Sequence, residues 1–325
     1  SFIEGATKTI VPHLQKGQLI ILESTTYPGC TDELVKPILE ESGLKAGKDF
    51  LLAFSPERVD PGNKAYPLSN VPKVVGGIDK QSTDIASLFY EQFTPKPFKV
   101  SSTRTAEMAK LLENIFRLVN VSLINELSLL CGKMDIDIWE VIEAAKTKPY
   151  GFVPFYPSPK IGGHCIPLDP FYLSWKAKEY NFWPRFIELA GEINEQMPHF
   201  VVTKVISALN KVKKSLNGSK ILVWGVTYKK DVADERESAA YEVMWDLSRK
   251  GAGLDYFDPY IKTFTFSKKT LSSIFYTPKI LKKYDLVVIL TDHSGFDYQE
   301  LARNAKLVVD TRNAINKKYP HVIRS

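Results

Sequence analysis

Residues 220–226 read Lys-Ile-Leu-Val-Trp-Gly-Val, a largely apolar run that begins after a polar, basic stretch. A run of this length is typical of a buried strand in a parallel sheet. Further short apolar runs occur at residues 254–257, 286–290 and 307–309, with helical patterns between them. Strands that alternate with helices predict a Rossmann-like, doubly wound α/β domain.

The first hundred residues show the same alternation of helices and strands. Helical patterns cover residues 3–14, 31–42 and 83–93, and strand patterns cover residues 18–24, 50–55 and 73–76. We therefore expect a second α/β domain with a mostly parallel sheet. A dinucleotide-binding domain carries Gly-x-Gly-x-x-Gly after its first strand, but this motif occurs nowhere in the 325 residues. Since the segment also opens on a helix, we expect this domain to be incomplete at its N-terminus, without opening βαβ units of roughly 100 residues.

The middle of the chain, from residue 105 to about residue 210, has a helical pattern. Its first part repeats apolar residues at helical spacing, namely Met108, Leu111, Leu112, Ile115 and Val119. Because this stretch exceeds an average helix, we expect it to join domains or subunits. The predicted architecture is α/β, with two Rossmann-like doubly wound domains joined by a long central helix and helical region. The predicted divisions are residues 1–104, 105–212 and 213–325.

Composition argues against several classes of protein. Hydrophobic residues make up 44% of the chain and charged residues 25%, as in an ordinary globular protein. The net charge of +6 suits an anionic small molecule, and no basic stripe of the kind that binds nucleic acid is present. No apolar run approaches the roughly 18 residues that span a bilayer, and no signal peptide is evident. Three cysteines without a pairing pattern and five scattered histidines lead us to expect the cytoplasm and no metal site.

The strongest chemical signal is Gly162-Gly-His-Cys-Ile-Pro-Leu-Asp-Pro170. Paired glycines let a backbone approach a ligand closely or adopt a positive φ. Asp169 is suited to cap a following helix, and a helix N-terminus can lower the pKa of a nearby thiol. Cys165 therefore has the surroundings of a nucleophilic thiolate, although a lone cysteine is more often a small buried hydrophobe. These residues also have structural explanations that need no catalysis: Asp169 can cap a helix, and Lys110 and Asn114 can lie on a solvent-exposed helix face.

Several ordered motifs make the chain resemble the UDP-glucose/GDP-mannose dehydrogenase family throughout its length, and most closely its UDP-N-acetylglucosamine 6-dehydrogenase branch. These motifs are Glu23-Ser-Thr-Thr-Tyr-Pro-Gly29, Phe54-Ser-Pro-Glu-Arg-Val-Asp-Pro-Gly62, Ala106-Glu-Met-Ala-Lys110 with Asn114, Gly162–Pro170, and Tyr228-Lys-Lys-Asp231 leading to Arg236-Glu-Ser238. The family oxidises C6 of a nucleotide-sugar from alcohol to carboxylate and uses NAD⁺ twice. The resemblance implies NAD as cofactor, a UDP-sugar as substrate and a role in surface polysaccharide biosynthesis. It also implies a homodimer or higher homo-oligomer formed through the central helix at Thr105–Met134, with no nucleic acid or membrane as partner.

The family's chemistry gives roles to the matching residues. A thiolate captures the C6 aldehyde as a thiohemiacetal, which is oxidised to a thioester and then hydrolysed. The resemblance implies that Cys165 is this nucleophile and that Lys110 stabilises the developing oxyanion. It further implies that Asn114 orients the same oxygen or a water.

The remaining implied roles concern proton transfer, hydrolysis and binding. Asp169 would take part in proton transfer through a water held by Thr25, and Glu57 would assist hydrolysis of the thioester. The implied cofactor contacts are Ser24, Thr25, Glu57 and Arg236. The implied substrate contacts are Val59, Lys110, Asn114, Tyr156, Ile161, Gly162, Lys229 and Arg312.

Two departures from the UDP-glucose enzymes narrow the implied substrate. Those enzymes have a second glutamate where this chain has Pro61, and a lysine where it has Leu168. Both changes, together with His164, are shared with the N-acetylhexosamine branch. We therefore expect UDP-N-acetylglucosamine, with UDP-N-acetylmannosamine and UDP-glucose as alternatives.

Two alternatives from other classes of protein are open. The absent glycine loop is compatible with an inactive nucleotide-sugar-binding fragment. A cysteine hydrolase that uses His164 and Cys165 is the less favoured alternative, because adjacent side chains rarely face each other and no third partner is evident.

Overall fold

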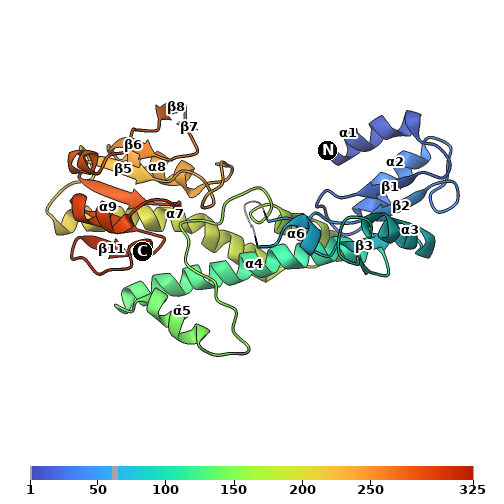
Figure 1. The fold of residues 1–325 in the computed structure, drawn as a ribbon, viewed down its shortest axis with the longest axis horizontal. Helices are drawn as coiled ribbons and strands as arrows, with labels where there is room; N and C mark the ends of the chain where they lie inside the picture. The colour runs from blue at the N-terminus through green and yellow to red at the C-terminus, as the bar shows by residue number, and fades with distance from the viewer. Residues whose placement is uncertain (1, 61–64, 325) are drawn as a thin grey trace. The chain divides into compact units, whose positions relative to one another are not determined.

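The structure, a computed structural model, describes residues 2–60 and 65–324 and divides into two compact units (Figure 1). The first unit comprises residues 1–116 and 168–184, and the second comprises residues 117–167 and 185–325. The division falls within helix α4 (Thr103–Lys133), and each unit is described by itself. Pro61, on which part of the substrate prediction depends, lies outside the described residues.

The first unit contains a four-stranded sheet in the order β1-β2-β3-β4 (Figure 1). Its strands are β1 (Leu19–Leu22), β2 (Leu51–Phe54), β3 (Val74–Gly77) and β4 (Phe98–Lys99). β1 and β2 are parallel, whereas β3 runs antiparallel to β2. The carboxyl ends of β1 and β2 and the start of β3 therefore share one edge of the sheet, the edge at which α/β proteins bind ligands.

Helices surround this sheet at the positions that the periodicity predicts. At the predicted positions are α1 (Phe2–Ile10), the 3₁₀ turn η1 (Val11–His13), the π-helical turn η2 (Thr31–Val35), α2 (Lys36–Glu40) and α3 (Lys80–Tyr90). The unit also contains α6 (Asp169–Ala177) and the 3₁₀ turns η3 (Leu68–Asn70) and η4 (Lys178–Tyr180). One core cluster includes Leu39, Phe50 and Leu52, and another joins Val75 to Tyr90. Both clusters bury the strands that carry the functional edge.

The second unit contains a five-stranded sheet in the order β11-β10-β9-β5-β6, and every pair in it is parallel. Its strands are β5 (Lys220–Trp224), β6 (Gly253–Phe257), β9 (Leu286–Ile289), β10 (Val308–Asp310) and β11 (Val322–Arg324). The remaining elements are α5 (Ile138–Lys146), α7 (Arg185–Lys211), α8 (Ala239–Arg249), the hairpin of β7 (Thr263–Phe266) and β8 (Lys269–Ser272), the 3₁₀ turn η5 (Pro278–Lys283) and α9 (Tyr298–Asn304). The Rossmann-like prediction is confirmed, and the strand order reverses direction at β5.

Two segments predicted to be helical are not helical. Residues 147–168 contain no helix, because prolines at positions 149, 154, 157 and 159 remove backbone donors and fix φ. Between β6 and β9 the chain forms the β7–β8 hairpin, in which Phe264 and Phe266 are buried on one face. Its two-residue turn has positive φ at Ser267 and Lys268, as tight hairpins require.

Helix α4 buries a polar residue, Glu107, beside part of its apolar repeat. Glu107 and Leu111 are fully buried, whereas Met108 is 39% and Leu112 is 59% exposed. The carboxylate of Glu107 accepts hydrogen bonds from the backbone N–H groups of Gly29 and Thr31 at 2.6 and 2.9 Å, and from the Thr31 hydroxyl at 2.7 Å. A buried carboxylate with three donors is well compensated, so the polar face packs inward.

Helix α4 also contains an 18-residue window of mean hydropathy 1.4, so by length and composition alone it could cross a membrane. The sequence-based expectation, which counted only unbroken apolar runs, missed this property. Polar side chains of α4 are nevertheless bonded within the second unit. The Ser122 hydroxyl donates to the Ala190 carbonyl at 2.8 Å, and the Asn125 side chain accepts from the Ser158 N–H at 2.9 Å. Such bonds are typical of a helix in a protein core.

We predict that Glu107→Ala lowers the free energy of unfolding by about 2–4 kcal/mol, because it leaves buried donors of Gly29 and Thr31 without an acceptor. Glu113→Ala on the same helix is the matched control, since Glu113 forms a surface ion pair with Arg58. We expect the control to change stability by about 0.5 kcal/mol or less. Urea denaturation measures both variants, and equal effects would contradict the assigned role of Glu107.

Candidate functional site

A cavity of about 540 Å³ lies within the second unit. Five residues predicted as substrate contacts line it, namely Tyr156, Ile161, Gly162, Lys229 and Arg312. The other lining residues are Val121, Trp139, Glu143, Pro157, Ser158, Lys160, Ile166, Tyr228 and Asn313. The cavity volume suits a small-molecule ligand, and the lining combines aromatic, cationic and polar groups.

The walls of the cavity offer two kinds of recognition. The rings of Trp139 and Tyr156 are stacked with their centroids 5.7 Å apart, and the Tyr156 hydroxyl donates to Glu143 at 2.9 Å. Flat aromatic faces suit a nucleobase. Lys229 and Arg312 supply positive charge, and Arg312 is oriented by an Nε bond of 3.2 Å to Asp292. Cationic side chains of this kind bind phosphate groups.

Lys160 holds the cavity loop in place, a role that sequence reasoning missed. Its side chain is only 2% exposed, and its Nζ bonds to Glu195 at 3.1 Å and Glu242 at 2.8 Å. Burial by itself lowers the pKa of Lys160, but the two carboxylates raise that pKa overall. Three closely spaced prolines precede Lys160 and indicate a rigid loop. The charge of a lysine side chain by itself suggests solvent exposure.

The loop that carries Cys165 is pressed against the segment after β5. A Cβ atom at Gly162 would lie 2.6 Å from the Glu237 carbonyl oxygen and 2.7 Å from the Cβ of Tyr228. At Gly163, which has φ of +87°, a Cβ would lie 2.8 Å from the Tyr228 ring. The Gly163 N–H also donates to the Arg236 carbonyl at 3.0 Å. Both glycines are therefore required by close approach, and Cys165 follows them as an exposed residue.

Arg236 belongs to the second unit, unlike the other predicted cofactor contacts. Its guanidinium is exposed and forms a forked pair with Asp234, at 3.0 Å through Nε and 2.7 Å through Nη2. This ion pair raises the pKa of Arg236 and fixes the direction of its side chain. Its role as a cofactor contact stays a prediction.

In the first unit, two of the predicted catalytic residues are bonded to each other. The Asn114 amide donates to the Asp169 carboxylate at 2.7 Å, and Asp169 is 2% exposed. Lys110 lies one turn before Asn114 on α4 and is half-buried. The solvated-face alternative is therefore wrong for Asn114, whose amide compensates a buried carboxylate.

The prediction that Asp169 caps a helix is wrong. Helix α6 includes Asp169 as its first residue, and the residue in the capping position is Leu168, which makes no side-chain cap bond. The carboxylate accepts from Asn114 instead. The catalytic role of Asp169 stays a prediction.

The predicted cofactor contacts of the first unit lie directly after the two parallel strands. Ser24 is exposed and Thr25 is half-buried after β1, and Glu57 is exposed after β2. The Glu57 carboxylate accepts from the N–H groups of Arg58 and Val59 at 2.7 and 2.6 Å. Hydroxyl and carboxylate groups at this edge can hydrogen-bond a ribose or a carboxamide, so they fit part of NAD.

Lys73 is a further residue of this edge that sequence reasoning missed. Its side chain is nearly fully buried, and Nζ donates to Glu23 at 3.2 Å and to the Pro56 carbonyl at 3.0 Å. It thereby ties the loop after β1 to the loop after β2, on either side of the predicted cofactor contacts. A single lysine before an apolar strand gave no signal of this role.

Comparisons with known proteins match three parts of the chain to one family. The NAD binding domain of the UDP-glucose/GDP-mannose dehydrogenase family matches residues 1–94, its central domain matches residues 104–196, and its UDP binding domain matches residues 222–317. The matches to the first and last models assign the NAD-binding part and the UDP-binding part of the chain.

Individual relatives are similar over nearly the whole chain. A UDP-N-acetyl-D-mannosamine dehydrogenase of Methanocaldococcus jannaschii is 34% identical over 98% of this chain and 71% of its own length. A UDP-N-acetyl-D-glucosamine 6-dehydrogenase of Pseudomonas aeruginosa is 35% identical over 90% of this chain and 69% of its own length. The solved structure of a UDP-D-ManNAc dehydrogenase from Pyrococcus horikoshii superposes with a TM-score of 0.89 at 31% identity and covers 100% of this chain and 76% of that one. With three domain models matched in order, this chain belongs to the UDP-glucose/GDP-mannose dehydrogenase family, whose members are NAD-dependent UDP-sugar dehydrogenases.

Proposed function

We propose that this protein oxidises C6 of a UDP-N-acetylhexosamine, with UDP-N-acetylglucosamine as the first choice, to the uronic acid used in surface polysaccharide biosynthesis. One observation carries the proposal. Gly162 lines a cavity together with Lys229 and Arg312, and the Cys165 thiol follows three residues later on the same loop. The names of the two relatives above support an N-acetylated sugar and leave both epimers as candidates.

The cavity of the second unit binds the nucleotide part of the substrate in this proposal. The stacked rings of Trp139 and Tyr156 take the uracil face, and Lys229 and Arg312 neutralise the diphosphate. A diphosphate held at one end of the cavity leaves the sugar to extend along Ile161 and Gly162 toward the loop of Cys165. Binding of the distant nucleotide thus orients the reacting carbon.

The thiol of Cys165 then supplies covalent catalysis. Its thiolate adds to the C6 aldehyde, which forms a carbon–sulfur bond and places negative charge on the former carbonyl oxygen. We assign Lys110 and Asn114 to this oxygen as cation and hydrogen-bond donor. NAD, held by Ser24, Thr25 and Glu57, supplies the hydride acceptor for both oxidations. Water attack on the thioester breaks the carbon–sulfur bond, releases the acid and returns the thiolate.

Asp169 moves protons in this scheme, together with a water at Thr25. Its pairing with Asn114 keeps one carboxylate oxygen engaged at 2.7 Å and orients the other. Glu57 assists the water that hydrolyses the thioester. Both carboxylates are therefore assigned to proton transfer rather than to the covalent step.

A second candidate function is binding of a nucleotide-sugar without turnover. It is favoured by one observation, that no Gly-x-Gly-x-x-Gly motif occurs in the 325 residues. Formation of NADH by this chain separates the two candidates.

We predict that the protein releases two NADH for each UDP-N-acetylglucosamine and that Cys165→Ser lowers acid formation by at least about 1,000-fold. The affinity for UDP should stay within about twofold, since the thiol is not a nucleotide contact. Cys131→Ser, at a half-buried position of α4, is the matched control and should keep activity. NADH absorbance and mass spectrometry of the product are compared for UDP-N-acetylglucosamine, UDP-N-acetylmannosamine and UDP-glucose. Acid formation by Cys165→Ser at the wild-type rate would refute the mechanism, and UDP binding without NADH would favour the second candidate.

We predict that Asn114→Asp destabilises the first unit most strongly at high pH. It places two carboxylates about 2.7 Å apart in a buried position, so the pair shares a proton and its folded-state pKa rises. Stability is then retained at low pH and lost as pH rises through that pKa. Thermal unfolding at about pH 5 and about pH 8 measures the difference. The double variant Asn114→Asp with Asp169→Asn again pairs one carboxylate with one amide, so it should recover most of the lost stability. A loss of stability in Asn114→Asp that is equal at both pH values would contradict the pairing.

The protein is proposed to form a homodimer through the second half of α4. Leu123, Leu127 and Leu130 on α4, and Met134 directly after it, follow one another at intervals of four and three residues, and all four are exposed. An exposed apolar stripe at this spacing is typical of a helix that packs against a partner. In a twofold-symmetric dimer the stripe of one protomer packs against the same stripe of its partner.

We predict that Leu123→Glu with Leu130→Glu weakens self-association at least about 100-fold, because two charges are placed in an apolar contact. Sedimentation equilibrium measures the dissociation constant. Val212→Glu, at another exposed apolar position of the second unit, serves as the control and should leave it unchanged. Wild-type protein that sediments as a monomer would exclude this interface.

A further inference from the structure

We propose that His293, paired with Asp258, is a positioning residue for the nucleotide-sugar cavity. The inference rests on the proposed function, because it concerns how one wall of that cavity is held. His293 itself does not line the cavity. It acts through the segment of residues 226–231, which contributes Tyr228 and Lys229 to the lining.

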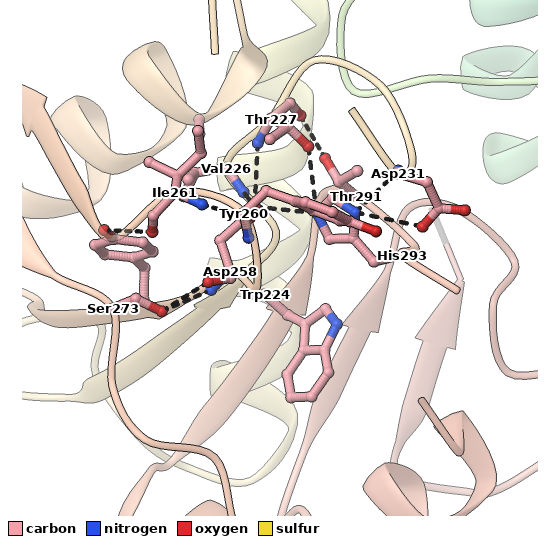
Figure 2. A network of polar contacts seen from close by, with 12 residues as sticks. Trp224, Val226, Thr227, Asp231, Asp258, Tyr260, Ile261, Ser273, Thr291 and His293 are labelled. Carbon is pink, nitrogen blue, oxygen red and sulfur yellow. Dashed lines mark hydrogen bonds and ion pairs between the residues drawn. The ribbon is translucent and has the colours of Figure 1, made fainter. Parts of the chain in front are cut away.

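His293 lies where three neighbouring strands end. Thr227 follows β5, Asp258 follows β6 and His293 follows β9, so all three sit at the carboxyl edge of the sheet (Figure 2). His293 is fully buried, with Nε2 at 3.0 Å from Asp258 Oδ2 and 3.2 Å from Thr227 Oγ1. This is the edge, and β5 the switch point, at which doubly wound sheets bind ligands.

The bonding partners decide which nitrogen of His293 carries the proton. Nδ1 lies 3.1 Å from the backbone nitrogen of Asp231, which can only donate, so Nδ1 is the acceptor. Nε2 therefore carries the hydrogen and donates it to Asp258. Thr227 Oγ1 gives its own proton to the Lys229 carbonyl at 3.0 Å. A neutral imidazole with this tautomer satisfies every one of these groups.

Asp258 is suited to hold this tautomer. Burial by itself raises the pKa of Asp258, but hydrogen bonds from His293 and from the Val226 N–H lower that pKa overall. The ionised carboxylate therefore accepts from Nε2 on one side and from the N–H groups of Tyr260 and Ile261 on the other, at 2.8 and 3.2 Å. Figure 2 shows these bonds converging on Asp258.

The segment of residues 226–231 is tied at both ends by this network. At its start, the Val226 N–H donates to Asp258 at 2.8 Å, and the Thr291 hydroxyl donates to the Thr227 carbonyl at 2.6 Å. At its end, Asp231 donates its N–H to His293 and accepts from the Ser294 N–H at 2.8 Å. Asp231 has φ of +58°, an uncommon conformation that these two bonds maintain.

The consequence reaches the catalytic loop through Tyr228. The Tyr228 ring leaves no room for a Cβ atom at Gly163, and the Cβ atom of Tyr228 leaves no room for one at Gly162. Loss of the acceptor at position 293 leaves the Asp231 N–H without its partner and loosens the segment. Lys229 and the Tyr228 support of the loop before Cys165 would then lose their fixed positions.

The test compares variants that keep different parts of the imidazole. His293→Gln can reach Asp258 but offers no acceptor at the place of Nδ1, whereas His293→Asn puts its Oδ1 there. We expect His293→Gln to weaken UDP binding, measured calorimetrically, roughly tenfold and to raise the KM for the UDP-sugar more than it lowers kcat. His293→Asn should recover affinity to within about threefold of wild type.

His321→Asn is the matched control, since the imidazole Nε2 of that histidine bonds to the Ala302 carbonyl in the same unit at 2.8 Å. It should leave UDP affinity unchanged. Thermal unfolding of every variant separates positioning from stability, because a merely structural histidine would lower the unfolding temperature without distinguishing Asn from Gln in affinity. If His293→Gln unfolds below the assay temperature, Thr291→Val removes another tie of the segment and should weaken UDP binding in the same direction.

Limited trypsin digestion makes the inference testable apart from the proposed function. Cleavage after Lys229 and Lys230 should be faster in His293→Gln than in wild type or His293→Asn, whether or not UDP binds. Equal cleavage rates, or equal UDP affinity of His293→Gln and a wild-type protein that binds UDP, would overturn the role of His293. Wild-type protein that binds no UDP, but shows the cleavage difference, would overturn the proposed function and keep the inference.

Discussion

The packing of Gly162 and Gly163 against Tyr228 is the constraint on which the rest of the site depends. No Cβ fits at either position, so the backbone before Cys165 is held against the segment after β5. That segment lines the same cavity as the glycine loop, which means that one contact sets both the nucleotide wall and the approach to the thiol. In the proposed function the thiolate of Cys165 needs this coupling, because a thiolate that is misplaced by about 1 Å loses much of its rate advantage.

Most of the fold could be predicted from local patterns, because the central strands of the second sheet, β5, β9 and β10, are short apolar runs buried on both faces. The strand predicted from residue 220 ends at Trp224, and the glycine after it has φ of +80°, as a turn out of the sheet requires. The β7–β8 hairpin could not be predicted in the same way. Its alternation spans four residues, and its turn uses Ser267 and Lys268 instead of the glycine or asparagine that usually marks such turns.

The site was only partly predictable, because its supporting residues are buried polar groups with partners far away in the sequence. Helix α4 shows the difficulty. Within its apolar repeat Leu111 is buried but Met108 and Leu112 are exposed. Glu107 and Asn114 are buried although polar, because Thr31 and Asp169 compensate them. Periodicity reports which residues are apolar and says nothing of whether a polar residue has a buried partner. The burial of Lys73 and Lys160 could not be predicted for the same reason, since their charges suggest solvent exposure.

The loop after β9 supplies several such hydrogen-bond partners to the residues around the cavity. Three consecutive residues of this loop hold two segments around the cavity, residues 226–231 and the segment that carries Arg312. Thr291 donates to Thr227, and Asp292 accepts from Arg312, a cation of the cavity. His293 completes the set by accepting from Asp231. Since the segments share this one loop, their energies are coupled, and effects of substitutions among them should not add. The positions of the cavity walls and of the cationic Arg312 are thus fixed by residues that no ligand needs to contact.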